Sequence, residues 1–431
     1  MPIAREDAAH LLRRTGFGST VAEIDQLAAF DRTAAVDRVL DISAAPAAPD
    51  PSFLTDSSLE DWEKHGKLIQ WWFDRMRTSP TPIVEKLTLF WHNHFVSAQS
   101  KLYDIQLLHR QNQLYRRLAL GNFRDLAQQM AIEPAMLKYL DNETNVAGVV
   151  QENFGRELME LMTLGPANYT EADVVAMSKA WTGHNLASDK RTYQFYANRH
   201  DNSTKTLFGI ARNWDGPAAL DEILVGSKQA AMARFVVAKL WSWFAYPNPA
   251  QNIVDDLAAV FVSSNLDIKA VMRALLLRDE FWAPATRYAL VRQPVEMVAA
   301  GMKAMALDGA ATHPEWFVDG MGQIPYDPPN VAGWKQNGYW VSTSSFWSRA
   351  AWAGYVQWVA RDAGVLAGLS TLTAAAAVQR AFDTFGIVDP SPVTRAALET
   401  WFAREKSARR EWGIPPGMVR LLLLTPDFNV C

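Results

Sequence analysis

Hydrophobic residues recur every three or four positions through most of the chain, and this spacing is typical of amphipathic α-helices. The pattern is clear in residues 8–12 and again in 21–40, whereas the alternation of a β-strand is scarce. The 431 residues are 49% hydrophobic and 20% charged, so they can bury a large core. We therefore predict a mainly α-helical protein: one large helical domain with a small irregular or β insertion near 190–210.

Proline, glycine and changes of periodicity divide the chain into parts. The predicted units are an N-terminal helical segment (1–45), a Pro/Ala-rich connector (46–58) and a main helical domain (59–431) with loop insertions at 186–215 and 307–345. The first insertion contains strand-like alternation at 192–196. The second is irregular and rich in proline, and long irregular stretches of compact proteins often carry function.

Charge and cysteine content exclude several classes of protein. With 42 basic and 46 acidic residues the net charge is -4, so there is no broad positive field and nucleic-acid binding is not expected. The single cysteine, Cys431, allows neither an intrachain disulfide nor a multi-cysteine metal site. No apolar run approaches the roughly 20 residues that cross a bilayer. Without a secretory signal at the start, a cytoplasmic location is expected, and a processed exported form stays open.

The predicted helix over 152–164 is rich in acidic residues. On a helical wheel Asn153, Glu157 and Glu160 share one stripe beside an apolar stripe. Residues three apart on a helix have Cβ atoms roughly 5 to 6 Å apart. The two glutamates are therefore close enough to share a metal ion or a proton, or to divide the roles of acid and base.

The same helix also has a purely structural interpretation. Arg156 lies four residues from both Glu152 and Glu160, so it can simply form ion pairs with them. If the helix instead belongs to an active site, Asn153 and Arg156 are candidate substrate-binding residues beside the two glutamates.

Histidines supply the candidate metal ligands. In the segment 90–95, His92 and His94 point about 200° apart if the chain is helical, and then cannot chelate one ion; in an extended chain they can. In the helical case His94 is most simply a core histidine, and His92 is then the candidate for a functional role. His200, beside Asp201 in the first insertion, is either a metal ligand or general base, or part of a solvated turn. Asp201 is a candidate catalytic residue.

The segment 328–334, of sequence PPNVAGW, is followed closely by Tyr339 and Trp340. Backbone held by proline, with aromatic side chains near it, can form a flat wall for a sugar ring or a peptide. We predict that Trp334 and Trp340 face a ligand. No Gly-x-Ser-x-Gly elbow, Walker loop, dinucleotide fingerprint after a strand or His-Glu-x-x-His motif is present, which weakens serine hydrolase, nucleotide-driven and zincin hypotheses.

Eight segments stand out in order along the chain: 11–18 (LLRRTGFG), 90–95 (FWHNHF), 133–137 (EPAML), 140–142 (LDN), 152–165 (ENFGRELMELMTLG), 169–174 (YTEADV), His200-Asp201 and 328–334 (PPNVAGW). Together they resemble a large bacterial family, the domain of unknown function numbered eighteen hundred. The likeness spans almost the whole chain and implies one family unit, but no agreed activity. Members are often encoded beside a sulfatase-like family, which implies polysaccharide or cell-surface chemistry. The chain departs from the pattern with Gln151 where relatives usually have Asn, and with His184 where Trp is typical.

A glycan-active enzyme is the leading hypothesis. Glycoside hydrolysis uses two carboxyl groups roughly 5 to 10 Å apart, a role that Glu157 and Glu160, or one of them with Asp201, can fill. Trp334 or Trp340 would then be the platform for the polysaccharide substrate.

Two alternatives stay open. The first is a metal-dependent enzyme whose divalent metal is held in a helical core by His92, Glu157, Glu160 and His200. The second is a non-catalytic partner of a sulfatase-like protein, in which the polar motifs merely satisfy one another. Convergence of these four side chains on a common cavity would separate the alternatives.

Overall fold

A computed structural model of the protein describes residues 1–44 and 49–431. These residues form 24 α-helices and two small two-stranded sheets, so the predicted mainly α fold is confirmed. Residues 45–48, in which the predicted connector begins, lie outside the described residues, and its remainder contains a 3-10 turn at Ser52–Thr55. No helix of the described residues is both long enough and apolar enough to cross a bilayer.

The first third of the chain is helical, and local sequence explains where several helices begin. The Thr20 hydroxyl caps the second helix in a capping box with Glu23, and the Asp31 carboxylate caps the third. The helices are α1 (Arg5–Thr15), α2 (Val21–Ala28), α3 (Arg32–Val39), α4 (Asp61–Thr78), α5 (Pro82–His94), α6 (Gln99–Leu102) and α7 (Ile105–Arg117).

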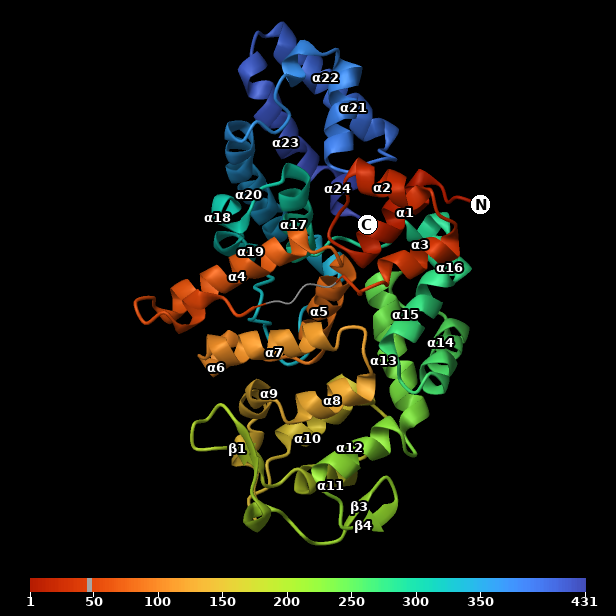
Figure 1. The fold of residues 1–431 in the computed structure, drawn as a ribbon, viewed down its shortest axis with the longest axis vertical. Coiled ribbons are helices and arrows are strands. Elements are labelled where there is room, and N and C mark those ends of the chain that lie inside the picture. The colour runs from red at the N-terminus through yellow and green to blue at the C-terminus, as the bar shows by residue number, and fades with distance from the viewer. Residues whose placement is uncertain (45–48) are drawn as a thin grey trace.

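The next part of the chain forms the end of the molecule that carries both sheets (Figure 1). Its helices are α8 (Phe123–Ala131), α9 (Pro134–Tyr139), α10 (Asn153–Glu157), which continues into a π-helical turn (Leu158–Thr163), and α11 (Glu171–Ala180). Two antiparallel hairpins follow, β1 (His184–Leu186) with β2 (Tyr193–Phe195), and β3 (Lys205–Leu207) with β4 (Ile210–Arg212). The β insertion predicted near 190–210 is therefore present.

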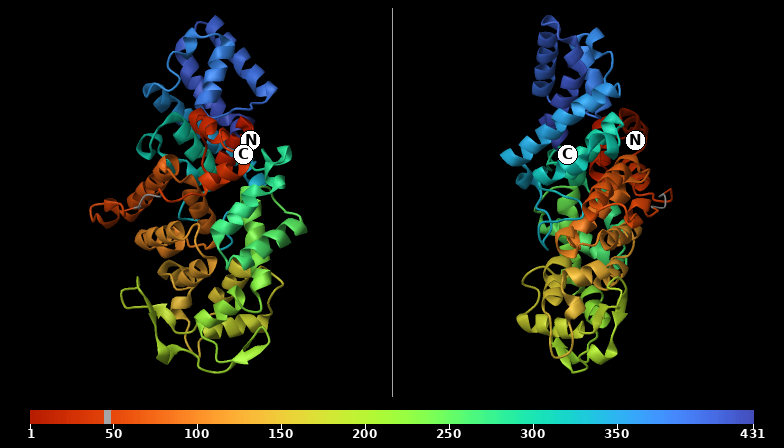
Figure 2. Two further views of the ribbon diagram at one scale, coloured as in Figure 1. Left: turned by 45° about the vertical axis from the view of Figure 1, so that its right-hand side comes forward. Right: turned by 90° about the vertical axis from the view of Figure 1, so that its left-hand side faces the viewer.

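The second half of the chain is again helical. Helices α13 and α14 pack side by side, as do α20 and α23, and the C-terminal helices occupy the end opposite the hairpins in every view (Figures 1 and 2). The elements are α12 (Gly216–Leu224), α13 (Gln229–Phe244), α14 (Gln251–Ser263), α15 (Ile268–Leu277), α16 (Asp279–Trp282), α17 (Pro294–Met305), α18 (Gly309–Thr312), α19 (Val318–Met321), α20 (Thr343–Asp362), α21 (Ala374–Thr384), α22 (Pro392–Ser407), α23 (Ile414–Leu424) and α24 (Pro426–Asn429).

One hydrophobic cluster runs through these helices, from Ala8 in α1 to Phe428 in α24. Large aromatic side chains fill much of it, and Trp72 and Trp241 are fully buried. Aromatic rings bury 150 to 250 Å² each, so they dominate the energy of such a core. The cluster is continuous through the described helices.

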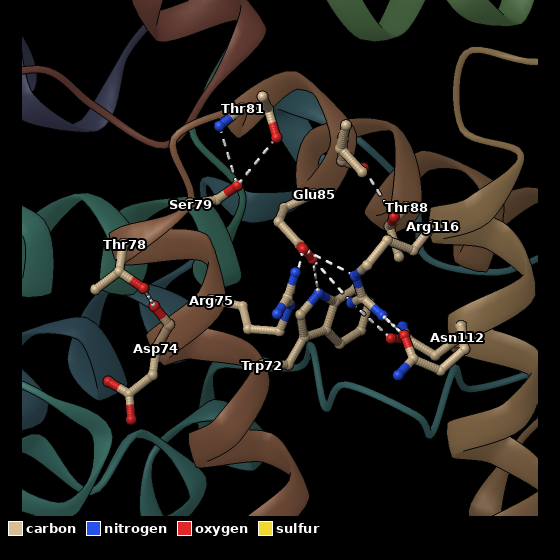
Figure 3. Close-up of polar contacts among 12 residues, drawn as sticks. Trp72, Asp74, Arg75, Thr78, Ser79, Thr81, Glu85, Thr88, Asn112 and Arg116 are labelled. Atoms are coloured by element: carbon tan, nitrogen blue, oxygen red, sulfur yellow. Dashed lines mark hydrogen bonds and ion pairs between the residues drawn. The ribbon is translucent and has the colours of Figure 1, made fainter. Parts of the chain in front are cut away.

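A buried polar cluster joins α4, α5 and α7 inside this core (Figure 3). The fully buried carboxylate of Glu85 accepts two hydrogen bonds from Arg116, at 2.8 and 2.9 Å, and one from Arg75 at 3.0 Å. The indole N–H of Trp72 donates a fourth at 3.0 Å. Because all its oxygens are engaged, this buried charge is compensated, and α5 is held firmly in position.

Candidate functional site

Helix α5 presents three consecutive polar side chains near its C-terminal end: His92, Asn93 and His94. The segment is helical from Pro82, a residue whose fixed φ suits a first turn. Successive residues of an α-helix are turned by about 100°, so the three side chains contact three different parts of the chain. His92 and His94 point apart, as the helical alternative predicted.

His92 anchors the segment that we call the proline loop (residues 325–335). Its Nε2 accepts a hydrogen bond from the backbone N–H of Tyr326 at 3.0 Å. The ring is buried against Trp72 and Trp334, with ring centroids 5.6 and 5.3 Å away. Burial lowers the pKa of His92 to about 3. The imidazole is therefore neutral, as an acceptor at Nε2 must be.

Asn93 holds the far end of the proline loop. Its Oδ1 accepts from the backbone N–H of Trp334 at 2.6 Å, and its Nδ2 donates to the Trp334 carbonyl at 3.3 Å. Gly333 has φ +76°, and a Cβ there would lie 2.6 Å from the Asn93 carbonyl oxygen. Only glycine combines that backbone conformation with such a close approach. Two neighbouring residues of α5 thus clamp both ends of one loop.

His94 contacts a different segment of the chain, the π-helical turn after α10. Its Nε2 donates to the carbonyl of Met162 at 2.9 Å, and its Nδ1 accepts from the Lys239 ammonium at 3.2 Å. Lys239, on α13, also donates to the carbonyl of Leu161 at 2.9 Å. The last carbonyls of a helix lack partners within it, and here two side chains satisfy them.

The predicted metal ligands His92, His94 and His200 lie in three separate environments. His200, in the hairpin region, places Nδ1 2.9 Å from the carbonyl of Thr182. Among residues 1–44 and 49–431, no three His, Cys, Asp or Glu side chains are grouped so that they could hold a metal ion. The structure does not bring the predicted ligands to a common centre.

Glu157 and Glu160 are both half-buried, but their surroundings differ. Burial raises the pKa of Glu157, and the charge of Glu160 raises it further. No hydrogen bond reaches the Glu157 carboxyl group from the described part of the chain. Glu160 instead accepts a hydrogen bond from the Tyr169 hydroxyl at 2.8 Å. Burial and this contact raise the pKa of Tyr169 to about 12, so the phenol stays a donor.

Arg156 and Asn153 form their hydrogen bonds with residues other than Glu157 and Glu160. Arg156 forms a bidentate ion pair with Glu171, at 2.8 and 2.9 Å, and a longer contact with Glu152 at 3.4 Å. The predicted pairing with Glu152 is therefore confirmed, whereas the pairing with Glu160 is wrong. The helix changes to a π-helical turn after α10, so the α-helical wheel does not apply to Glu160.

Tyr139, at the end of α9, lies within electrostatic range of both α10 and the proline loop. Burial raises the pKa of its hydroxyl, and the charges of Asp327 and Glu157 add to the shift. Both carboxylates therefore lie within electrostatic reach of one phenol. Lys101 donates to the Tyr139 carbonyl at 2.6 Å and lies 3.0 Å from both carboxylate oxygens of Asp141. That Asp141 carboxylate also accepts a 3.3 Å hydrogen bond from Asn153.

An open cavity of about 660 Å³ lies along the proline loop. Its lining combines acidic, basic, amide and aromatic side chains: Ser100, Asp319, Gly322, Ile324, Asp327, Pro328, Pro329, Asn330, Ala332, Gly333, Trp334, Lys335 and Tyr339. Ser100 donates its backbone N–H to Asp327 at 2.8 Å, so α6 forms part of the wall. The volume lies within the range of small-molecule sites.

The two tryptophans that we predicted to face a ligand are mostly buried. Trp334 lines the cavity but is only 4% exposed, and its ring packs on His92. Trp340 is 3% exposed. Accessible aromatic side chains close to Trp340 in the sequence are Tyr339, at 56%, Phe346, at 55%, and Trp347, at 76%.

His200 and Asp201 belong to a turn of the β insertion. The Asp201 carboxylate accepts a hydrogen bond from the backbone N–H of Ser203 at 2.8 Å. The backbone carbonyl of Asp201 accepts a hydrogen bond from the Lys205 ammonium. Burial alone would raise the pKa of Asp201, but the Ser203 contacts outweigh burial and lower it. None of these contacts involves Glu157 or Glu160.

The family model described as a protein of unknown function, DUF1800, matches residues 10–430. The chain belongs to the DUF1800 family. The resemblance seen in the sequence motifs is thereby confirmed. No curated protein and no solved structure matches the chain.

In this DUF1800 protein, three of the motifs form one structural unit. The FWHNHF segment holds the PPNVAGW loop through His92 and Asn93, and the ENFGRELMELMTLG helix through His94. Sequence reasoning missed Lys239 and Asp327, which lie outside the eight segments. The only sequence signal that pointed to Asp327 was its position directly before PPNVAGW.

Proposed function

We propose that this DUF1800 protein is a hydrolase that acts on glycans, with Glu157 as general acid and Glu160 as general base. The observation that carries the proposal is the contrast between two neighbouring carboxyl groups. Glu157 has a raised pKa, and Glu160 has the Tyr169 hydroxyl as hydrogen-bond donor. Environments that separate two carboxyl groups in this way distinguish acid from base in glycosidases.

The reaction needs one proton donor and one acceptor. Glu157 would give its proton to the glycosidic oxygen while the bond from that oxygen to the anomeric carbon breaks. Glu160 would take a proton from the water whose oxygen bonds to the same carbon. The proton that Glu160 gains then returns through solvent to Glu157, which completes the cycle.

Substrate binding is assigned to the cavity along the proline loop. Asp327 and Asn330 offer hydrogen-bonding groups of the kind that sugar hydroxyls use, and Tyr339 offers an accessible ring. The charges of Asp327, which lines this cavity, and of Glu157 both raise the pKa of Tyr139, which supports a location of the cavity near the acid pair. We therefore assign the role of sugar platform, which we predicted for Trp334 and Trp340, to Tyr339.

The acid role is tested with a panel of neutral, acidic and sulfated polysaccharides, by release of reducing ends. Glu157→Gln should lower kcat by about 100- to 10,000-fold, as loss of a general acid does. Glu152→Gln, an exposed acid beside the same helix, is the matched control and should leave kcat unchanged. Equal kcat for Glu157→Gln and the wild type, or no cleavage of any glycan by the folded protein, would contradict the proposal.

The platform role has a separate kinetic signature. Tyr339→Ala should raise KM and change kcat little, because a stacking ring binds substrate and transition state alike. Trp62→Ala, another exposed aromatic side chain but on α4, should change neither constant. A fall in kcat without a change in KM would contradict the platform role.

A further inference from the structure

A second cavity, of about 320 Å³, lies between α5 and α13. Both helices and the segment after the proline loop contribute to its lining, which includes Phe90, Asn93, Phe235, Lys239, Ser242 and Gln336. No residue that we assign to the acid, the base or the sugar-binding role lines this cavity.

Lys239 brings an uncompensated positive charge to this cavity. Its ammonium contacts two neutral acceptors, the Leu161 carbonyl at 2.9 Å and Nδ1 of His94 at 3.2 Å. His94 is itself neutral, because its Nε2 donates to a carbonyl and burial lowers its pKa well below the usual value. Within residues 1–44 and 49–431, no carboxylate lies at ion-pair distance from Lys239.

Lys86 shows how an acid can compensate a buried ammonium in this chain. The buried ammonium of Lys86 forms an ion pair with the Glu296 carboxylate, as a buried charge normally requires. Lys239 has no such partner and instead lines a cavity of ligand size. A bound anion would supply the counter-charge that Lys239 lacks within the described residues.

The other residues that line the cavity indicate the chemistry of the bound molecule. The rings of Phe90 and Phe235 form an apolar wall, and the Lys239 ammonium lies 4.8 Å from the centre of the Phe235 ring. The Ser242 hydroxyl donates to the Ala238 carbonyl, which leaves its oxygen free to accept. The Gln336 side chain makes no hydrogen bond within the described chain. One cation, an apolar wall and an amide suit a flat molecule with a single negative charge.

We propose that this cavity binds a small organic monocarboxylate with a flat apolar body, whose carboxylate pairs with the Lys239 ammonium. A single ammonium matches a monoanion better than a phosphate, which brings up to two charges into a place with one compensating cation. The amide of Gln336 can donate to the second carboxylate oxygen.

Calorimetric titration of the wild-type protein with benzoate and with benzamide tests the charge. The two probes have nearly the same shape, and only benzoate is an anion. We expect benzoate to bind at least tenfold more tightly than benzamide and more tightly than inorganic phosphate. Equal affinity for benzoate and benzamide, or tighter binding of phosphate, would overturn the proposal. This comparison needs no variant and does not depend on the folding of one.

The assignment to Lys239 is tested by Lys239→Met, which should weaken benzoate binding at least tenfold. Lys228→Met is the matched control, because the Lys228 ammonium also contacts a carbonyl, that of Asn168, and an aromatic ring, that of Phe208, yet lines no part of this cavity. It should leave affinity unchanged. In crystals of the wild type soaked with 4-bromobenzoate, the bromine anomalous peak should lie in this cavity; a peak elsewhere, or none, would overturn the assignment.

Discussion

Replacing Glu85 by alanine should destabilise this protein far more than replacing an exposed acid. The carboxylate is fully buried and accepts hydrogen bonds from Arg116, Arg75 and Trp72, so it ties α4 and α7 to α5 (Figure 3). Helix α5 carries the residues that clamp the proline loop. Stability and the geometry of the site are therefore linked through one carboxylate.

The size of the loss in stability follows from the charge of Arg116, which stays buried when Glu85 is removed. The Arg116 side chain is 7% exposed, so without Glu85 its charge stays buried with only neutral partners, Asn112 and Gln113. Breaking a buried ion pair by removing one partner costs about 3 to 5 kcal/mol. Arg75 is more exposed and can turn toward water, so it adds little. We expect Glu85→Ala to lower the free energy of unfolding by about 3 to 5 kcal/mol.

Urea unfolding followed by circular dichroism measures this cost. Asp61→Ala is the control, because Asp61 is exposed and its partner Lys64 lies 4.0 Å away, and such a pair contributes less than about 1 kcal/mol. The double variant Glu85→Leu with Arg116→Met should lose less than Glu85→Ala alone, since it leaves no buried arginine without its acid. The reasoning fails if Glu85→Ala and Asp61→Ala cost the same.

The pH dependence of this cost has a definite sign. Burial by itself would raise the pKa of Glu85, but the charges and hydrogen bonds of Arg116 and Arg75 outweigh burial and lower it. A carboxyl group with a lowered folded pKa stabilises the protein above its unfolded pKa, about 4.3, and loses that contribution as pH falls through the folded value. The difference in stability between wild type and Glu85→Ala should therefore be constant near neutral pH and shrink below about pH 4.

Three further substitutions test other parts of the structure. Gly333→Ala should lower the melting temperature, since the residue has φ +76° and the new Cβ would lie 2.6 Å from a backbone oxygen, whereas Gly338→Ala, with open space around it, should not. Gly155→Ala should also destabilise, because its Cβ would lie 2.4 Å from the hydroxyl of Ser178 on α11. Burial raises the pKa of Glu133 to about 7, so its contribution to stability is lost as pH rises from about 4.3 through 7, and Glu133→Gln should flatten that dependence in unfolding experiments at pH 5 and pH 8.

Much of the fold follows from periodicity, because a helix that packs on a core must place apolar residues on one side. Helix α15 is an example, because its buried residues recur at a spacing of three or four: Ile268, Val271, Met272, Leu275 and Leu276. The short strand predicted at 192–196 is β2. The irregular stretch 307–345 also contains α18 and α19, of four residues each, too short to show a period.

The candidate site was harder to predict, because its geometry depends on contacts between distant segments. The helical wheel assumes an α-helix, but Glu160 lies in a π-helical turn, so its predicted position was wrong. A π-helical turn has no sequence signature of its own. Trp334 is buried because His92, more than 200 residues earlier, supplies a surface for its ring. Periodicity within one segment carries no information about such a partner.

The neutral histidines of α5 explain how a motif rich in polar residues can serve a site without entering its chemistry. His94 and Lys239 bind the carbonyls of Met162 and Leu161, the two residues that follow Glu160 in the π-helical turn. Any movement of these carbonyls would move the Glu160 backbone with them. Because burial keeps His94 uncharged over the physiological range, this support does not change with pH. The pH dependence of the proposed hydrolysis should therefore follow Glu157, whose pKa is raised, and not the histidines of α5.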